Sequence, residues 1–117
     1  MKIKLNILLV LFSLVVFNHN TLASDQSGAQ SLVIIKGYKF IPQEITIKRG
    51  QKIRWENREK RQYHSVWFEA LGEEEPEDYM FPDDESFAYT REFKKSGTFP
   101  YRCGPHPKMT GTVRVID

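Results

Sequence analysis

Residues 45–56 read ITIKRGQKIRWE, and this stretch decides the fold class. Isoleucines alternate with polar residues at positions 45–48, an Arg49-Gly50 turn follows, and Ile53 and Trp55 resume the alternation. Successive side chains of a β-strand point to opposite faces, so a period of two indicates strands with one buried face. The stretch therefore predicts two strands joined by a tight turn, each with one face in a hydrophobic core.

Short alternating segments recur along the chain, separated by turn residues. They lie at residues 66–68, 87–93, 99–103 and 112–116. No stretch shows sustained helical spacing, although residues 69–79 have room for a turn or two of helix. Several short strands separated by turns predict an all-β domain, a small antiparallel sandwich or barrel.

The first residues carry the pattern of a secretory signal peptide, which we assign to residues 1–23. Lys2 and Lys4 precede an apolar run at residues 5–17, and the small-residue cleavage pattern Thr21-Leu22-Ala23 follows. The run is shorter than the roughly 20 apolar residues that span a bilayer, so no stable membrane insertion is expected after cleavage. A retained signal anchor is the alternative. We expect export to the periplasm.

Cleavage would leave a flexible lead-in at residues 24–30 and one domain at residues 31–117. Because Lys2 and Lys4 leave with the signal, 15 basic residues would face 15 acidic ones. The whole-chain charge of +2 is therefore no argument for nucleic-acid binding, and no basic stripe supports it.

Charge is unevenly distributed along this domain. Residues 36–61 hold nine basic side chains, whereas residues 69–85 hold nine acidic ones. Solvated strand faces and a solvated loop explain most such charges. The alternative is a surface that orients a charged partner, which would make the association rate fall with added salt.

Residues 103–109, Cys-Gly-Pro-His-Pro-Lys-Met, place a thiol, an imidazole and a thioether at three-residue intervals. His64 and His106 are the histidines that remain after signal removal. A thiolate, two imidazoles and a weak thioether suit copper, which alternates between Cu(I) and Cu(II), whereas structural zinc usually takes four strong Cys and His ligands. Taken singly, His64 is more often a hydrogen-bonded surface histidine and Met109 a core filler. The combination favours a metal site.

Cys103 is the sole cysteine, so no internal disulfide forms, and a free surface thiol or an intermolecular disulfide is the alternative to a metal ligand. Phe99, Tyr101 and Cys103 share one strand face, and two large aromatic rings indicate that this face points inward. Cys103 is therefore predicted at the inner end of a core strand. Such a position argues against a surface disulfide.

The chain resembles the cupredoxins, the small type 1 (blue) copper proteins, over residues 31–117. The resemblance rests on residues 37–42, 45–57, 64–68 and 97–103 and on the loop that follows. The short Cys-x2-His-x2-Met spacing is similar to that of the amicyanins, and plastocyanins and pseudoazurins have a longer interval before the methionine. The resemblance implies a Greek-key β-sandwich that holds one copper ion through His64, Cys103 and His106 in the equatorial plane and Met109 as the axial ligand.

The resemblance also implies a function. We expect a periplasmic, monomeric one-electron carrier that is not an enzyme and that exchanges electrons through the His106 edge with a cytochrome c, dehydrogenase or oxidase type of partner. A copper-tolerance cupredoxin that binds or oxidises periplasmic Cu(I) is the alternative. An oxidase with a copper cluster would need many more histidines.

The sequence departs from the common cupredoxin pattern in two places. Ser65 stands where an asparagine commonly follows the first ligand histidine and braces the cysteine loop, and a shorter hydroxyl would do so less rigidly. The acidic segment 69–85 contains Met80, either a second soft ligand or a loop hydrophobe.

Overall fold

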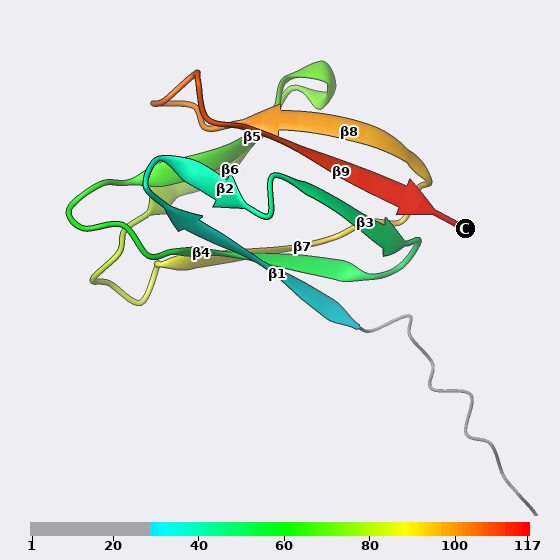
Figure 1. Ribbon diagram of the computed structural model, residues 1–117, viewed down its shortest axis with the longest axis horizontal. Helices are drawn as coiled ribbons and strands as arrows, with labels where there is room; N and C mark the ends of the chain where they lie inside the picture. Colours follow the sequence, from blue (N-terminus) through cyan, green and yellow to red (C-terminus); the bar gives the residue numbers. More distant parts are fainter. Residues whose placement is uncertain (1–28) are drawn as a thin grey trace, which may run out of the picture.

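The computed structural model describes residues 29–117; the predicted signal peptide and residues 24–28 of the predicted lead-in lie outside the described residues. Within this part of the chain, strands form two facing sheets (Figure 1). The first sheet has the order β2 (Lys39–Ile41), β1 (Gln30–Lys36), β4 (Lys52–Asn57), β7 (Ala88–Glu92). The second has the order β3 (Glu44–Lys48), β9 (Thr110–Ile116), β8 (Gly97–Arg102), β5 (His64–Phe68), β6 (Glu73–Met80).

The prediction of a small all-β sandwich is confirmed, and the structure adds that both sheets are mixed. β1 pairs with β4 in parallel, and β3 pairs with β9 in parallel, whereas the other pairs are antiparallel. An alternating pattern is the same for both pairing directions, so it predicts the strands without their orientation. No helix among residues 29–117 is long and apolar enough to cross a membrane.

The helical expectation for residues 69–79 is wrong beyond the first turn. Glu69–Leu71 form a short 3₁₀ helix, η2, which ends at Gly72 with φ 65°, and β6 follows at once. β6 lies at the edge of its sheet, where charged side chains face water and protect an open edge from aggregation. Its acidic composition offers none of the apolar alternation that predicted β3, β4, β5, β7, β8 and β9, and β1 and β2 were not predicted from the sequence either.

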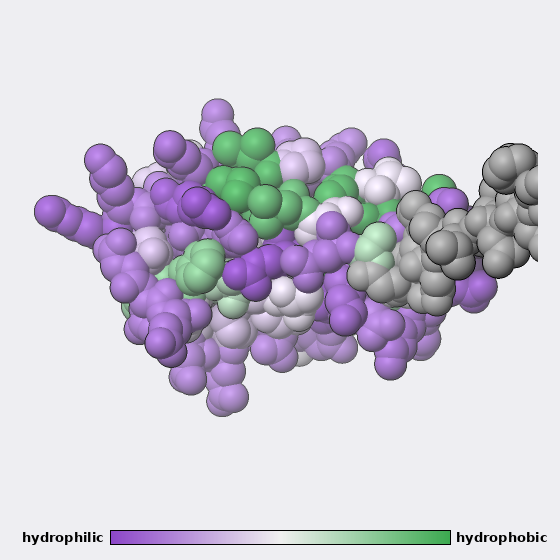
Figure 2. Space-filling view, turned by 90° about the horizontal axis from the view of Figure 1, so that it is seen from below, coloured by the Kyte–Doolittle hydropathy of each residue, from purple (hydrophilic) through white to green (hydrophobic). Residues whose placement is uncertain are grey.

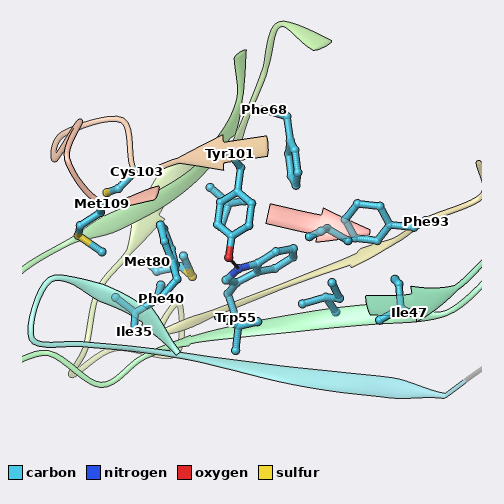
Figure 3. Close-up of a cluster of buried hydrophobic side chains, with 14 of the residues drawn as sticks. Ile35, Phe40, Ile47, Trp55, Phe68, Met80, Phe93, Tyr101, Cys103 and Met109 are labelled. Carbon is cyan, nitrogen blue, oxygen red and sulfur yellow. Dashed lines mark hydrogen bonds between the residues drawn. The ribbon is translucent and has the colours of Figure 1, made fainter. Parts of the chain in front are cut away.

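The core between the sheets is rich in aromatic rings, with Trp55 at its centre (Figure 3). Trp55 Nε1 donates a hydrogen bond to Tyr101 Oη over 3.2 Å, which satisfies both buried polar atoms. Gly111 lies opposite Tyr101 in the β8–β9 ladder, and a Cβ there would lie 2.7 Å from Cε1 of the Tyr101 ring. A glycine is thus needed where this ring crosses the neighbouring strand.

Two loops meet at one end of the sandwich, residues 58–63 between β4 and β5 and residues 103–109 between β8 and β9 (left in Figure 1). The buried Asn57 amide ties the first loop down. Its Nδ2 donates to Gln62 O at 2.7 Å and to Met80 O at 2.8 Å, and its Oδ1 accepts from Glu59 N at 3.0 Å. This end of the sandwich carries the candidate site. The face of the molecule seen in Figure 2 is mostly hydrophilic.

Candidate metal centre

Three donor side chains converge at this end, although they come from distant parts of the chain. β5 begins at His64, β8 leads directly into Cys103, and His106 follows in the loop. Cys103 Sγ lies 3.5 Å from His64 Nδ1 and 3.5 Å from His106 Nδ1, and the ligand atoms of all three lie within 4.8 Å of one another. The fold thus brings His64 to the loop, as the sequence requires.

The loop that carries His106 is closed by backbone hydrogen bonds. Cys103 N donates to Met109 O over 2.9 Å, and Met109 N donates to His106 O over 2.9 Å. Pro107 lies inside that second turn, where its fixed φ favours the bend. Met109 is buried, and its side chain lies at the Cys103 end of the core in Figure 3. The loop thereby returns its thioether to the site.

Cys103 is fully buried, which confirms the inward orientation predicted from strand alternation and excludes a surface thiol. Ser65 N donates to Sγ over 3.4 Å. Burial raises the pKa of the Cys103 thiol, and the nearby Glu74 carboxylate adds to the effect, while the hydrogen bond from Ser65 opposes it. The metal-free site therefore holds a protonated thiol at neutral pH, and metal binding would release that proton.

His64 is also fully buried. Burial, with a smaller contribution from His106, lowers the pKa of His64 to about 4 against the opposing effect of Glu59. Its Nε2 is the buried side-chain atom that lacks a hydrogen-bond partner within residues 29–117, and Glu59 Oε1 lies 3.7 Å away. A neutral imidazole is the form that binds metals, and its second nitrogen commonly faces a carboxylate.

Tyr38 covers the two histidines from outside. Its ring centroid lies 5.1 Å from that of His106 and 5.9 Å from that of His64, both edge to face. It also lines an apolar depression with Pro105, His106, Pro107 and Met109. The sequence did not single out Tyr38. It lies in the Gly37-Tyr38 turn with φ 55°, and a bulky residue in this region is a signal that only the backbone reveals.

Ser65 braces the cysteine loop in the place of the usual asparagine. Its Oγ accepts a hydrogen bond from Gly104 N over 2.9 Å and donates one to Glu74 Oε1 over 2.8 Å. Arg102 supports the same segment through hydrogen bonds of 3.1 Å to Cys103 O and Gly104 O. The sequence did not indicate a role for Glu74, because this residue falls in the segment where a turn or two of helix was expected.

Met80 ends β6 and is fully buried in the hydrophobic core, so it is not a loop residue. In Figure 3 its sulfur lies apart from the sulfur atoms of Cys103 and Met109. The acidic segment around it forms η2, β6 and the connection to β7.

The site's donor set, with its soft sulfur and two imidazole nitrogens beside a buried thioether, fits a single type 1 copper ion. Residues 29–116 match the copper-binding proteins of the plastocyanin/azurin family, and the chain belongs to this family.

Similar proteins within this family include amicyanins and a plastocyanin. The chain is 35% identical to the amicyanin of Paracoccus versutus over 95 residues, which cover 80% of this chain and 70% of that protein. It is 33% identical to the plastocyanin of Scenedesmus fuscus over 100 residues, which cover 75% of this chain and 93% of that protein. An oxidised proline-to-alanine mutant of amicyanin superposes with a TM-score of 0.65 at 34% identity, covering 76% of this chain and 83% of that one.

Proposed function

We propose that the chain is a periplasmic blue copper protein that carries single electrons, with His64, Cys103 and His106 as equatorial ligands and Met109 as the axial ligand. The observation that supports it best is the convergence of a thiol and two imidazole nitrogens within 4.8 Å, in a site built from a core strand and a closed loop. Copper bound there would supply the exchange of one electron between Cu(II) and Cu(I).

The protein's own contribution is to hold the donors still. Backbone hydrogen bonds close the ligand loop, and Pro105 and Pro107 restrict the backbone around His106. His64 is neutral without metal at neutral pH and is held in the core. Such a site needs little rearrangement when its charge changes. Four protein donors also leave no open position of the kind that a catalytic metal keeps, which supports a carrier over an enzyme.

Electrons would enter and leave at His106, the ligand histidine that is only partly buried. The depression around it offers a small, mostly apolar contact surface in which Lys108 is the charged lining residue. A transient contact with a redox protein, such as a c-type cytochrome or a dehydrogenase, would suit a carrier that must also dissociate. We infer a monomer, and a periplasmic location that rests on the signal pattern of residues 1–23.

The docking part of this proposal is tested by placing one negative charge on the rim. Pro107→Glu should slow electron exchange with a purified c-type cytochrome by tenfold or more, because it buries a charge in the contact, and the visible spectrum of the variant shows whether the loop that Pro107 restricts has changed. Thr46→Glu adds the same charge on β3 at an exposed position. Equal rates for the two variants would contradict exchange through the His106 edge.

Copper tolerance is the competing outcome, and a deletion strain separates the two functions. A carrier predicts a loss of respiratory or other electron flow at low copper. A strain that becomes copper-sensitive while its electron flow is intact would contradict the carrier and establish copper handling instead.

A further inference from the structure

Ser65 and Glu74 meet because of the strand register. Trp67 of β5 pairs with Glu74 of β6, and the register shifts at Ser65, two residues before Trp67, between the His64 and Val66 pairs. The half-buried Glu74 side chain reaches the fully buried Ser65 hydroxyl, at 2.8 Å.

Gly104 is matched to this pair. A Cβ at residue 104 would overlap the Glu74 carboxylate and lie 2.9 Å from Ser65 Oγ. Glycine therefore lets a carboxylate approach the backbone immediately after Cys103. The Gly104 amide, the serine hydroxyl and the carboxylate form one continuous chain of hydrogen bonds.

No salt bridge neutralises the charge on Glu74 among the described residues. Arg102 binds the same loop segment, but it pairs with Glu69 and donates to two loop carbonyls. Within residues 29–117, Glu74 takes part in no ion pair shorter than 4.0 Å. A partly buried charge is screened less than an exposed one, so its field reaches the neighbouring sulfur.

We propose that Glu74 is a positioning residue of the copper site, which with Ser65 fixes Gly104 and places a negative charge beside the Cys103 sulfur. This inference rests on the proposed copper ligation. The hydrogen-bond chain braces the residue that follows Cys103. It also ends in a charge, which a neutral amide in the same place would not supply. This charge favours the more positive oxidation state of the bound ion, Cu(II), and so lowers the reduction potential.

Glu74→Gln tests the charge, since it keeps an oxygen that can accept from Ser65. The visible spectrum should remain that of the wild type. At a fixed applied potential, the ratio of Cu(I) to Cu(II) in the variant should be at least threefold higher than in the wild type. For a one-electron couple, a threefold shift corresponds to about 30 mV. Glu77→Gln removes the same charge from an exposed position on β6 and is the matched control. Equal shifts in the two variants would overturn the proposal.

Glu74→Ala tests the bracing, with hydrogen exchange of the Gly104 amide in the metal-free protein as the readout. Removing the acceptor frees the Ser65 hydroxyl, so the Gly104 N–H should exchange at least tenfold faster than in Glu77→Ala. The double variant Glu74→Ala with Ser65→Asn should restore slow exchange without restoring the charge, and should keep the raised potential. Unchanged exchange in Glu74→Ala would overturn the proposal.

The exchange measurement needs no copper, so it separates this inference from the proposed function. A wild-type protein that binds copper without colour would contradict the copper ligation alone. Altered Gly104 exchange in that case would still show the brace.

Discussion

His64 and Cys103 meet at a contact of 3.5 Å, and burial acts on both in the same direction. It disfavours the charged form of each, so it lowers the pKa of the imidazole and raises that of the thiol. The metal-free site is therefore uncharged at these two positions at neutral pH. Copper affinity should rise with pH, since binding releases the thiol proton.

The lowered pKa of His64 predicts that the metal-free protein loses stability as the pH falls. Its pKa is about 4 in the folded protein and 6.5 in the unfolded chain, so between these values the unfolded chain binds more protons. The neutral, buried His64 thus contributes on the order of 3 kcal/mol to the free energy of unfolding. This contribution is complete above pH 6.5 and is lost as the pH falls toward 4. Urea unfolding across this range should show a smaller loss for His64→Asn than for the wild type. Equal losses of stability in His64→Asn and the wild type would mean that protonation of His64 does not cause this pH dependence.

Met80 should behave as a core residue and not as a second ligand. Met80→Leu conserves the buried volume and removes the sulfur, so it should leave the protein binding one copper ion per chain with an unchanged spectrum. Met109→Leu is the control, because loss of the proposed axial ligand should change the spectrum. A fall in bound copper for Met80→Leu, measured by metal analysis, would indicate a second site.

At the scale of elements, Asn57 joins the end of β4, the 58–63 loop and the end of β6. Asn57→Ala leaves the buried Met80 carbonyl, the partly buried Gln62 carbonyl and the Glu59 amide without this partner, so we expect a loss of about 3 kcal/mol in the free energy of unfolding. Denaturant unfolding of the metal-free protein measures it, with the exposed Lys60→Ala as a control near zero. A loss below about 0.5 kcal/mol would mean that water replaces the amide.

Strand alternation predicts β3, β4, β5, β7, β8 and β9, and it misses β1, whose residues 32–35 are all apolar, as well as β2 and β6. The strands around Ile47, Trp55 and Tyr101 follow the pattern because their inner faces pack in the core. β6 does not, because an acidic edge strand gains little from apolar alternation. The parallel pairings could not be predicted from the sequence either, since side chains alternate in the same way in parallel and antiparallel strands.

The candidate site divides in the same way. The inward orientation of Cys103 follows from its parity with Tyr101, and the structure shows it. The contact between Ser65 and Glu74 depends on the β5–β6 register, which is interrupted between His64 and Val66 by a bulge. Bulges are set by tertiary packing and leave no local pattern in this sequence. The ring of Tyr38 is placed by a left-handed turn that has no signature beyond Gly37.

Across the whole molecule, charge is separated more strongly than the net value suggests. The acidic segment 69–85 forms η2, β6 and the connection that follows, and some of its charges pair internally, as Glu73 does with Arg91. If the other acidic side chains of segment 69–85 orient a partner, association with a cationic redox protein should slow as salt is added. Above 0.1 M salt the Debye length falls below about 10 Å, so the attraction between the two charged surfaces is screened. Stopped-flow rates at several ionic strengths measure this. A rate independent of salt would mean that these charges only solvate the surface.

We propose that Cys103 binds copper as a thiolate within this sandwich. The decisive measurement is a titration of the purified domain with Cu(II), followed by visible absorption. We expect an intense thiolate-to-copper band that saturates at one copper ion per chain and is absent in Cys103→Ser. A colourless copper complex of the wild type, or the same band in both proteins, would contradict it.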